Sequence, residues 1–91
     1  MINMVTTKKP TDLLKVGDEL NGFTIVRVGN RNDEEGVLLA VKDRTGQAGP
    51  QKEYVTARFS ERSLSFKEWW LGHYSTNEEE SHKDYAERLK L

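Results

Sequence analysis

Residues 53–60 constrain the fold most strongly, because apolar and polar side chains alternate along them as in a half-buried β-strand. The side chains expected to face the core are Val55, Ala57 and Phe59, and those on the opposite face are Tyr54, Thr56 and Arg58. A strand with an apolar face must bury that face against another layer of structure. The rest of the chain therefore has to supply neighbouring strands and a covering element.

Two segments that precede residues 53–60 also have the composition of strands. Residues 20–28 are rich in β-branched and aromatic side chains, and Gly22 indicates a bend near their start. Their apolar residues fall on both faces, which predicts a β-bulge or a strand covered on both sides. Residues 37–42 are almost continuously apolar, as in a strand inside a sheet, and polar loops containing glycine separate the three segments.

The aromatic residues between 64 and 75 predict a fourth strand, which follows a turn at 61–63. Adjacent tryptophans in a strand point to opposite faces, so Trp69 and Trp70 would send one ring to each side of the sheet. The pattern leaves the register of this strand open. We therefore expect an antiparallel meander of three to five strands that could curl into a barrel.

The C-terminal segment predicts a helix of about 14 residues, with three glutamates in its first turn and basic residues in its last, as the helix dipole favours. Ser75, Thr76 or Asn77 can cap its start. The residues expected to form its sheet-facing stripe are His82, Tyr85, Ala86 and Leu89. A helix of this length is marginal alone, so it should pack on the sheet. The prediction is a single α+β domain over residues 11–91, preceded by a flexible lead-in at 1–10.

Composition excludes several classes of protein. The chain has 91 residues, no cysteine and a net charge of −1. This length leaves no room for a second domain or a deep cofactor cavity, which excludes large cofactor-dependent enzymes. Without cysteine there is no disulfide, thiolate zinc site or thiol nucleophile, and the reducing cytoplasm is the expected location. No apolar run has the length of a signal peptide or a membrane span, so we expect no membrane association.

Motifs that would indicate an enzyme are missing from the sequence. It has no phosphate-binding loop, dinucleotide fingerprint, zinc-protease motif or calcium loop. His73 and His82 are its two histidines, and Ser60, Ser63 and Ser65 have no histidine nearby in sequence to activate them, so no triad is recognisable. A hydrolase built on one histidine and a carboxylate has no supporting catalytic spacing. We therefore expect neither an enzyme nor a bound metal or cofactor.

Aromatic and basic residues interleave in the second half of the chain, and this cluster is the best functional signal. The candidate binding residues are Tyr54, Arg58, Arg62, Lys67, Trp69, Trp70 and Tyr74. Large rings also fill small cores, so core packing is the simpler explanation for some of them. Exposed on one sheet face, these residue types predict an accessory or adaptor module that binds another protein. The alternative is a single-stranded nucleic-acid-binding module, in which rings stack bases and cations contact phosphates, although the near-neutral charge argues against it.

Three short motifs resemble those of small uncharacterised bacterial proteins of prophages and mobile elements. They are a Tyr54-Val55-Thr56 strand, a Trp70-Leu71-Gly72-His73-Tyr74 strand and a closing acidic helix with Lys83-Asp84-Tyr85-Ala86-Glu87-Arg88. The likeness covers about residues 53–90, and the chain departs from it at Ala57, where an aromatic residue is more usual, and in the long approach at 64–68. The resemblance implies a sheet-plus-helix fold and an accessory role in a mobile element, and it assigns no activity.

The chain is expected to be a monomer or a twofold dimer. The predicted sheet has two edges, and the strand after Gly49-Pro50 could pair with a second copy as readily as within the chain. A protein partner of unknown identity is the expected ligand.

Overall fold

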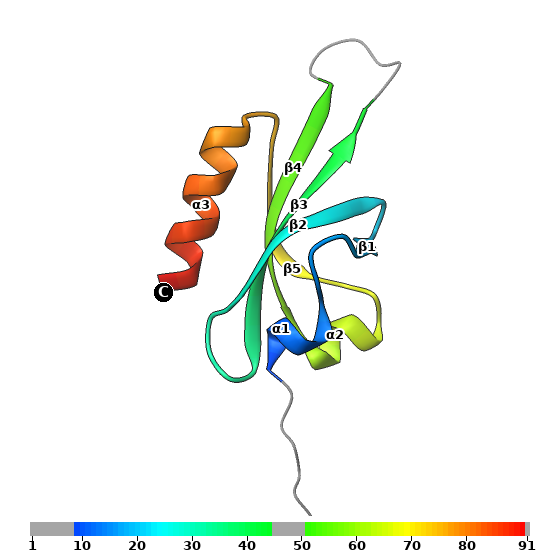
Figure 1. The fold of residues 1–91 in the computed structure, drawn as a ribbon, viewed down its shortest axis with the longest axis vertical. Helices are drawn as coiled ribbons and strands as arrows, with labels where there is room; N and C mark the ends of the chain where they lie inside the picture. Colours follow the sequence, from blue (N-terminus) through cyan, green and yellow to red (C-terminus); the bar gives the residue numbers. More distant parts are fainter. Residues whose placement is uncertain (1–8, 45–50, 91) are drawn as a thin grey trace, which may run out of the picture.

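A computed structural model of the chain describes residues 9–44 and 51–90. Five strands and three helices follow one another along the chain (Figure 1). They are α1 (Pro10–Leu13), β1 (Glu19–Leu20), β2 (Phe23–Asn30), β3 (Glu35–Asp43), β4 (Lys52–Ser60), α2 (Glu61–Ser65), β5 (Trp70–Ser75) and α3 (Glu78–Lys90). The predicted lead-in falls mostly outside the described residues, but Pro10 begins α1 and is buried.

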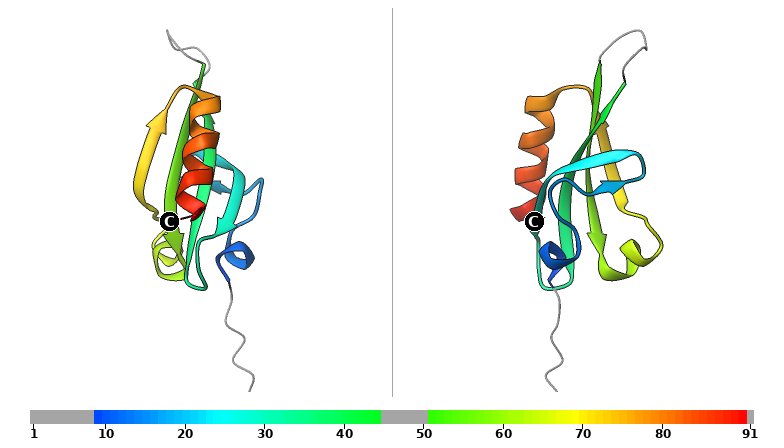
Figure 2. Two further views of the ribbon diagram at one scale, coloured as in Figure 1. Left: turned by 90° about the vertical axis from the view of Figure 1, so that its left-hand side faces the viewer. Right: turned by 45° about the vertical axis from the view of Figure 1, so that its right-hand side comes forward.

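The five strands form one antiparallel sheet in the order β1-β2-β3-β4-β5, so each strand pairs with its sequence neighbours. The sheet curls into a half-barrel, and α3 lies along its outer face (Figure 2). This arrangement confirms the predicted α+β meander with one C-terminal helix. No helix within residues 9–44 or 51–90 is long and apolar enough to cross a membrane.

A β-bulge in β2 explains why apolar residues occur on both faces of this strand. Ile25 pairs with Ala40 of β3, whereas Arg27 pairs with Leu39, so Val26 is an extra residue in the ladder. The bulge confirms one of the two predictions for residues 20–28. The strand is also covered on both sides, because α1 and the core lie on one face and α3 on the other.

The two faces of the central strands pack into two separate apolar clusters. The cluster inside the half-barrel contains Leu14, Phe23, Ile25, Leu38, Ala40, Val55, Ala57 and Phe59. The cluster beneath α3 contains Val37, Leu39, Tyr54 and Tyr85. The alternation predicted for residues 53–60 is confirmed, and the face opposite the main core is buried as well, because α3 covers it.

Helix α3 is capped by Asn77, whose side-chain oxygen accepts a hydrogen bond from the Glu80 amide at 2.9 Å. The sheet-facing residues differ from the predicted stripe. Ser81, Tyr85 and Arg88 are buried, His82 and Leu89 are half-buried, and Ala86 is exposed. The prediction for Ala86 was wrong because the stripe was centred on apolar residues, whereas a polar serine and arginine occupy two of the buried positions.

The predicted strand over 64–75 begins only at Trp70, because residues 61–65 form helix α2. Ser60 caps this helix: its hydroxyl accepts from the Ser63 amide at 3.2 Å, and the Ser63 hydroxyl accepts from the Ser60 amide at 2.9 Å. This reciprocal pair is a capping box built from two serines, and it ends the strand locally. After α2 the chain turns through Lys67, whose φ is +57°.

Strand β4 has both of its edges paired within the chain. It is hydrogen-bonded to β3 on one side and to β5 on the other. A strand inside a sheet has no free backbone groups to offer a second copy, so the structure shows the within-chain alternative for this strand, and the choice between monomer and twofold dimer stays a prediction. The edges of the sheet are β1, which has two residues, and β5, which has six.

Candidate functional site

The seven side chains predicted to form one binding face lie in different parts of the structure. Tyr54 is 7% exposed beneath α3, and Arg58 is half-buried on the same strand. Trp69 and Tyr74 lie at the opening of the half-barrel, next to Phe23. The remaining residues, Arg62, Lys67 and Trp70, belong to α2, the following turn and the start of β5. The single aromatic face is absent because α3 covers β4 and the chain turns between 61 and 69.

Three rings form a cluster at the open side of the half-barrel. Phe23 packs edge-on against Trp69 with ring centroids 5.7 Å apart, and its centroid lies 6.1 Å from that of Tyr74. The Trp69 indole Nε1 donates a hydrogen bond to the Tyr74 hydroxyl at 3.3 Å. A Cβ at Gly72 would lie 3.0 Å from the Tyr74 ring, so glycine leaves room for this ring. These contacts fix Tyr74 in place while half of it remains exposed.

Exposed apolar side chains are concentrated in the segment of the chain that carries Trp69 and Tyr74. Among the described residues, four large hydrophobic side chains are exposed, and three of them lie in nine consecutive positions: Phe66 (66%), Leu71 (56%) and Tyr74 (54%). The fourth, Val16, lies before β1 at 65% exposure. We call Phe66, Leu71 and Tyr74 the α2–β5 surface.

Two residues of the segment that carries the α2–β5 surface have a left-handed backbone conformation. Lys67 and Leu71 have φ values of +57° and +54°, a region that ordinary L-residues rarely adopt. Leu71 lies in a β-bulge, because Thr56 pairs with His73 whereas Arg58 pairs with Trp70. Such strain tends to cluster at binding and catalytic sites, where the surrounding structure maintains it.

Strand β5 is also an open edge of the sheet (Figure 2). Within the part of the chain that the structure describes, its backbone pairs with β4 alone. Residues 69–77 contain no aspartate, glutamate, lysine or arginine, although 32% of the chain is charged. Charged side chains commonly keep an edge strand from pairing with other chains. In β5, which lacks them, the bulge has this role.

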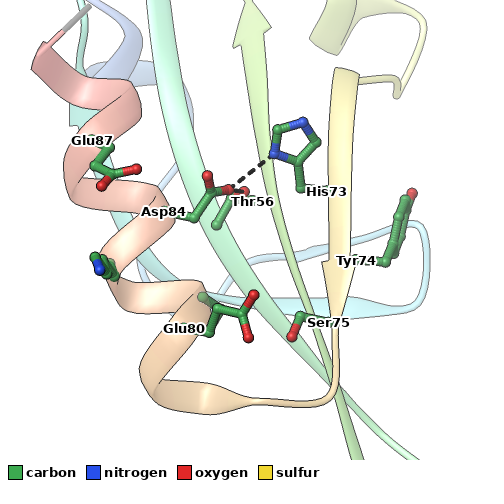
Figure 3. Close-up of a pocket in the computed structure, with 9 residues that line it drawn as sticks. Thr56, His73, Tyr74, Ser75, Glu80, Asp84 and Glu87 are labelled. Carbon is green, nitrogen blue, oxygen red and sulfur yellow. Dashed lines mark hydrogen bonds and ion pairs between the residues drawn. The ribbon is translucent and has the colours of Figure 1, made fainter.

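A polar network joins α3 to β4 and β5 on the outer face of the sheet (Figure 3). Its centre is one carboxylate oxygen, Asp84 Oδ2, which accepts a hydrogen bond from the buried Thr56 hydroxyl. The same oxygen lies 3.2 Å from His73 Nδ1 and 3.7 Å from Arg88 Nε. Arg88 is buried, and its Nη1 donates to the Thr56 carbonyl at 3.2 Å.

Burial by itself would raise the pKa of Asp84, but its pKa is lowered below the usual value of 3.8. The hydrogen bonds from Thr56 and His73, together with the positive charge of Arg88, stabilise the carboxylate more than burial disfavours it. The Asp84 carboxylate is therefore ionised at neutral pH and holds α3 against the sheet.

A cavity of about 450 Å³ adjoins this network between α3 and β5. Its lining residues include His73, Ser75, Glu80 and Asp84 (Figure 3), and Lys83 lines it as well. The Thr56 hydroxyl is hydrogen-bonded in this network, but it is buried and donates to the Asp84 carboxylate rather than to a histidine. A nucleophile needs a base within reach and access to substrate, so the arrangement is one of anchoring. No group of three potential metal ligands occurs in residues 9–44 and 51–90.

A second cavity of about 470 Å³ brings together two of the predicted site residues, Arg62 and Trp70. The β2–β3 hairpin supplies its acidic side, with Asp33, Glu34 and Glu35. With Glu61 the lining carries four carboxylates against the Arg62 guanidinium, and Glu35 is already paired with Arg31 at 3.0 Å.

Comparisons with known proteins leave the chain without an assigned relative. No family model matches it, and neither the curated proteins nor the solved structures give a significant match. The resemblance to small proteins of prophages and mobile elements therefore stays a prediction.

Asp84 and Leu71 shape these sites but are not among the binding residues predicted from the sequence. Asp84 was read as part of an acidic helix, and Leu71 as an ordinary strand residue. The sequence held one indication of the role of Asp84: Thr56 is a polar residue on a strand face that a helix could cover, so it would need a polar partner on that helix. For Leu71 no local pattern indicated the left-handed conformation, which glycine normally adopts.

Proposed function

We propose that the protein is a small accessory or adaptor module that binds another protein through the α2–β5 surface. The observation that carries this proposal is the concentration of Phe66, Leu71 and Tyr74, all more than half exposed, beside an open edge strand. Exposed apolar side chains that cluster on a small domain are typical of interaction sites. The absence of cysteine supports a cytoplasmic location for this module.

Rigidity of the surface supports the proposal further. Tyr74 is held by the Trp69 indole and by packing on Phe23, so it loses little side-chain freedom when a partner covers it. Aromatic side chains of this kind are enriched among residues that contribute most to protein association. Leu71 projects from a strained bulge, and binding is a function that would retain such strain.

Single-stranded nucleic-acid binding is a second candidate, favoured by one specific feature. The Lys42 ammonium lies 5.8 Å from the centroid of the Phe23 ring, so a cation flanks the same aromatic cluster as the exposed Tyr74 ring. A base could stack on Tyr74 while Lys42 contacts a phosphate. The net charge of −1 favours the protein partner instead.

Site-specific photo-crosslinking tests the protein-binding proposal. A photoreactive amino acid at position 71 is expected to capture a discrete partner in cells, and the same group at Val16 is expected to capture none of it. Val16 is a matched control because it is apolar and at least as exposed as Leu71 (65% against 56%) but does not belong to the α2–β5 surface. Phe66→Ser and Leu71→Ser should each abolish capture from a probe at position 74, whereas Val16→Ser should not. Equal capture from positions 16 and 71 would refute the proposed surface.

A titration with a mixed-sequence single-stranded oligonucleotide distinguishes the second candidate. In a Trp70→Phe background, tryptophan fluorescence reports on Trp69 beside Tyr74. Quenching that weakens steeply as salt is raised would indicate phosphate contacts and favour nucleic acid. Unchanged fluorescence at low salt would eliminate that candidate.

A further inference from the structure

Trp70 and Arg62 are predicted binding residues that the α2–β5 surface does not include. Trp70 is half-buried at the start of β5, yet it belongs to neither apolar cluster and is not among the side chains packed against them. Within residues 9–44 and 51–90, its ring takes part in no aromatic pair or cation–π contact, and its indole N–H has no hydrogen-bond partner. A large, half-buried ring outside the core is a common wall of a ligand pocket.

The Trp70 side chain lines the cavity of about 470 Å³ at the end of the molecule where α1, α2 and the β2–β3 hairpin come together (Figure 1). An aliphatic side chain, Leu13 of α1, also lines it. The cavity therefore offers apolar contact beside its charged groups. Trp70 precedes Leu71 in β5, so a partner that covers Leu71 can reach this cavity.

The charges of the cavity are unbalanced. Asp33, Glu34 and Glu61 line it, and their carboxylates form no ion pair with any residue that the structure describes. Glu35 is already paired, and the one cation in the lining is Arg62. An additional cation would therefore be attracted to this site, whereas an anion such as a phosphate would be repelled.

A guanidinium group matches this combination of residues better than an ammonium group does. Its planar fork donates paired hydrogen bonds to a carboxylate, and its flat face stacks on an aromatic ring. Tryptophan is the side chain whose ring attracts a cation most strongly. The aliphatic stem of an arginine can lie along an apolar side chain such as Leu13 while its charged end reaches the carboxylates.

We propose that this cavity binds an arginine side chain of the protein partner, while the α2–β5 surface binds apolar side chains of the same partner. The inference rests on the proposed function, because it names the chemistry of the partner next to the same strand. It also favours a protein over the nucleic-acid candidate, since carboxylates beside the surface repel a phosphate backbone.

Titration of the ¹⁵N-labelled full chain with N-acetyl-arginine amide tests the cavity directly. The indole N–H signal of Trp70, assigned with a Trp69→Phe variant, should shift, and the response should weaken as salt is raised. N-acetyl-citrulline amide has nearly the same shape without the charge, so it should leave this signal in place. A Trp70 signal that ignores the arginine compound, or that moves equally with both compounds, would overturn the proposal.

Three variants test the role of charge. Glu34→Gln combined with Glu61→Gln should weaken binding of N-acetyl-arginine amide about tenfold, the effect of losing one charge-assisted hydrogen bond. Both side chains are exposed, so these changes should leave the fold intact. Arg62→Gln should tighten binding, because it removes a like charge from the lining. Glu79→Gln combined with Glu80→Gln is the matched control, since it removes two carboxylates of α3 that do not line this cavity. Weaker binding in Arg62→Gln, or an equal loss in the α3 control, would contradict the proposal.

Partner capture separates this inference from the proposed function. Capture from a photoreactive group at position 71 should fall severalfold in the Glu34→Gln and Glu61→Gln double variant. Complete capture in that variant would overturn the arginine proposal and leave the α2–β5 surface as the partner site. No capture from position 71, together with a charge-dependent Trp70 response to N-acetyl-arginine amide, would refute the proposed function and support the chemistry assigned to the cavity.

Discussion

Replacing Thr56 with valine removes one hydroxyl group from the most enclosed contact between α3 and the sheet. The two side chains have nearly the same shape, so the apolar packing of β4 is kept. Thr56 is 1% exposed, and no water can take the place of its hydroxyl from the sheet side. The Asp84 carboxylate would lose a donor while remaining only 31% exposed.

The size of the effect follows from this geometry. Removing a hydrogen bond to a charged group lowers the free energy of unfolding by about 1.5–3 kcal/mol. Because Asp84 can recover some solvation from its exposed third, we expect a loss near the lower end, about 1.5 kcal/mol. For a domain of this size, about 1 kcal/mol corresponds to 4–8 °C, so the melting temperature should fall by about 10 °C.

The pH dependence supplies a second, independent check. The pKa of Asp84 is lowered in the folded protein, so its stabilising contribution is complete above the unfolded pKa of about 3.9 and is lost as the pH falls through the lower folded value. The difference between wild type and Thr56→Val should therefore be largest near neutral pH and should shrink in acid.

Urea denaturation followed by circular dichroism, at pH 7 and at about pH 3, measures both quantities. Thr24→Val is a matched control, because Thr24 lies half-buried in β2 and its hydroxyl has no hydrogen-bond partner among the described residues. A Thr56→Val protein as stable as Thr24→Val at pH 7 would refute the reasoning. So would a loss of the same size at both pH values.

Three further substitutions are also measured by urea denaturation. Gly36→Ala should cost about 1–3 kcal/mol, because its Cβ would lie 2.5 Å from the buried Phe59 ring, and a loss under about 0.5 kcal/mol would contradict this. Leu71→Gly should raise the free energy of unfolding by about 1 kcal/mol, because glycine adopts a φ of +54° without strain, and the variant should no longer capture the partner. A less stable Leu71→Gly protein would argue against backbone strain at this position. Ser60→Ala should cost about 1 kcal/mol by removing the cap of α2, which a Ser60→Asp protein should retain.

The strands and the C-terminal helix were predictable because local patterns specify them. Alternation over residues 53–60 identifies β4, and apolar residues on both faces of residues 20–28 indicate the bulge at Val26. Residues 64–69 were mispredicted because aromatic content suggested a strand, whereas the Ser60–Ser63 capping box starts a helix there. A short capping motif outweighs propensity when the segment has no partner strand beside it.

The candidate site was harder to predict, because exposure depends on packing between distant segments. Tyr54 and Trp69 have the residue types of a binding site, yet Tyr54 packs beneath α3 and Trp69 packs on Phe23. Phe66 and Leu71 became exposed because of the turn and bulge around them, which the sequence pattern did not reveal.

The amino-acid sequence by itself determined that this chain forms an antiparallel sheet with a helix on it. A period of two residues divides each strand into two faces, and this division depends only on the order of the side chains. Only the tertiary structure decided which face α3 covers, and hence that Tyr54 is buried while Tyr74 stays exposed. The physical reason is that alternation creates two faces without saying which second layer will pack on each. That choice depends on contacts such as Thr56 with Asp84, which lie 28 positions apart in the chain.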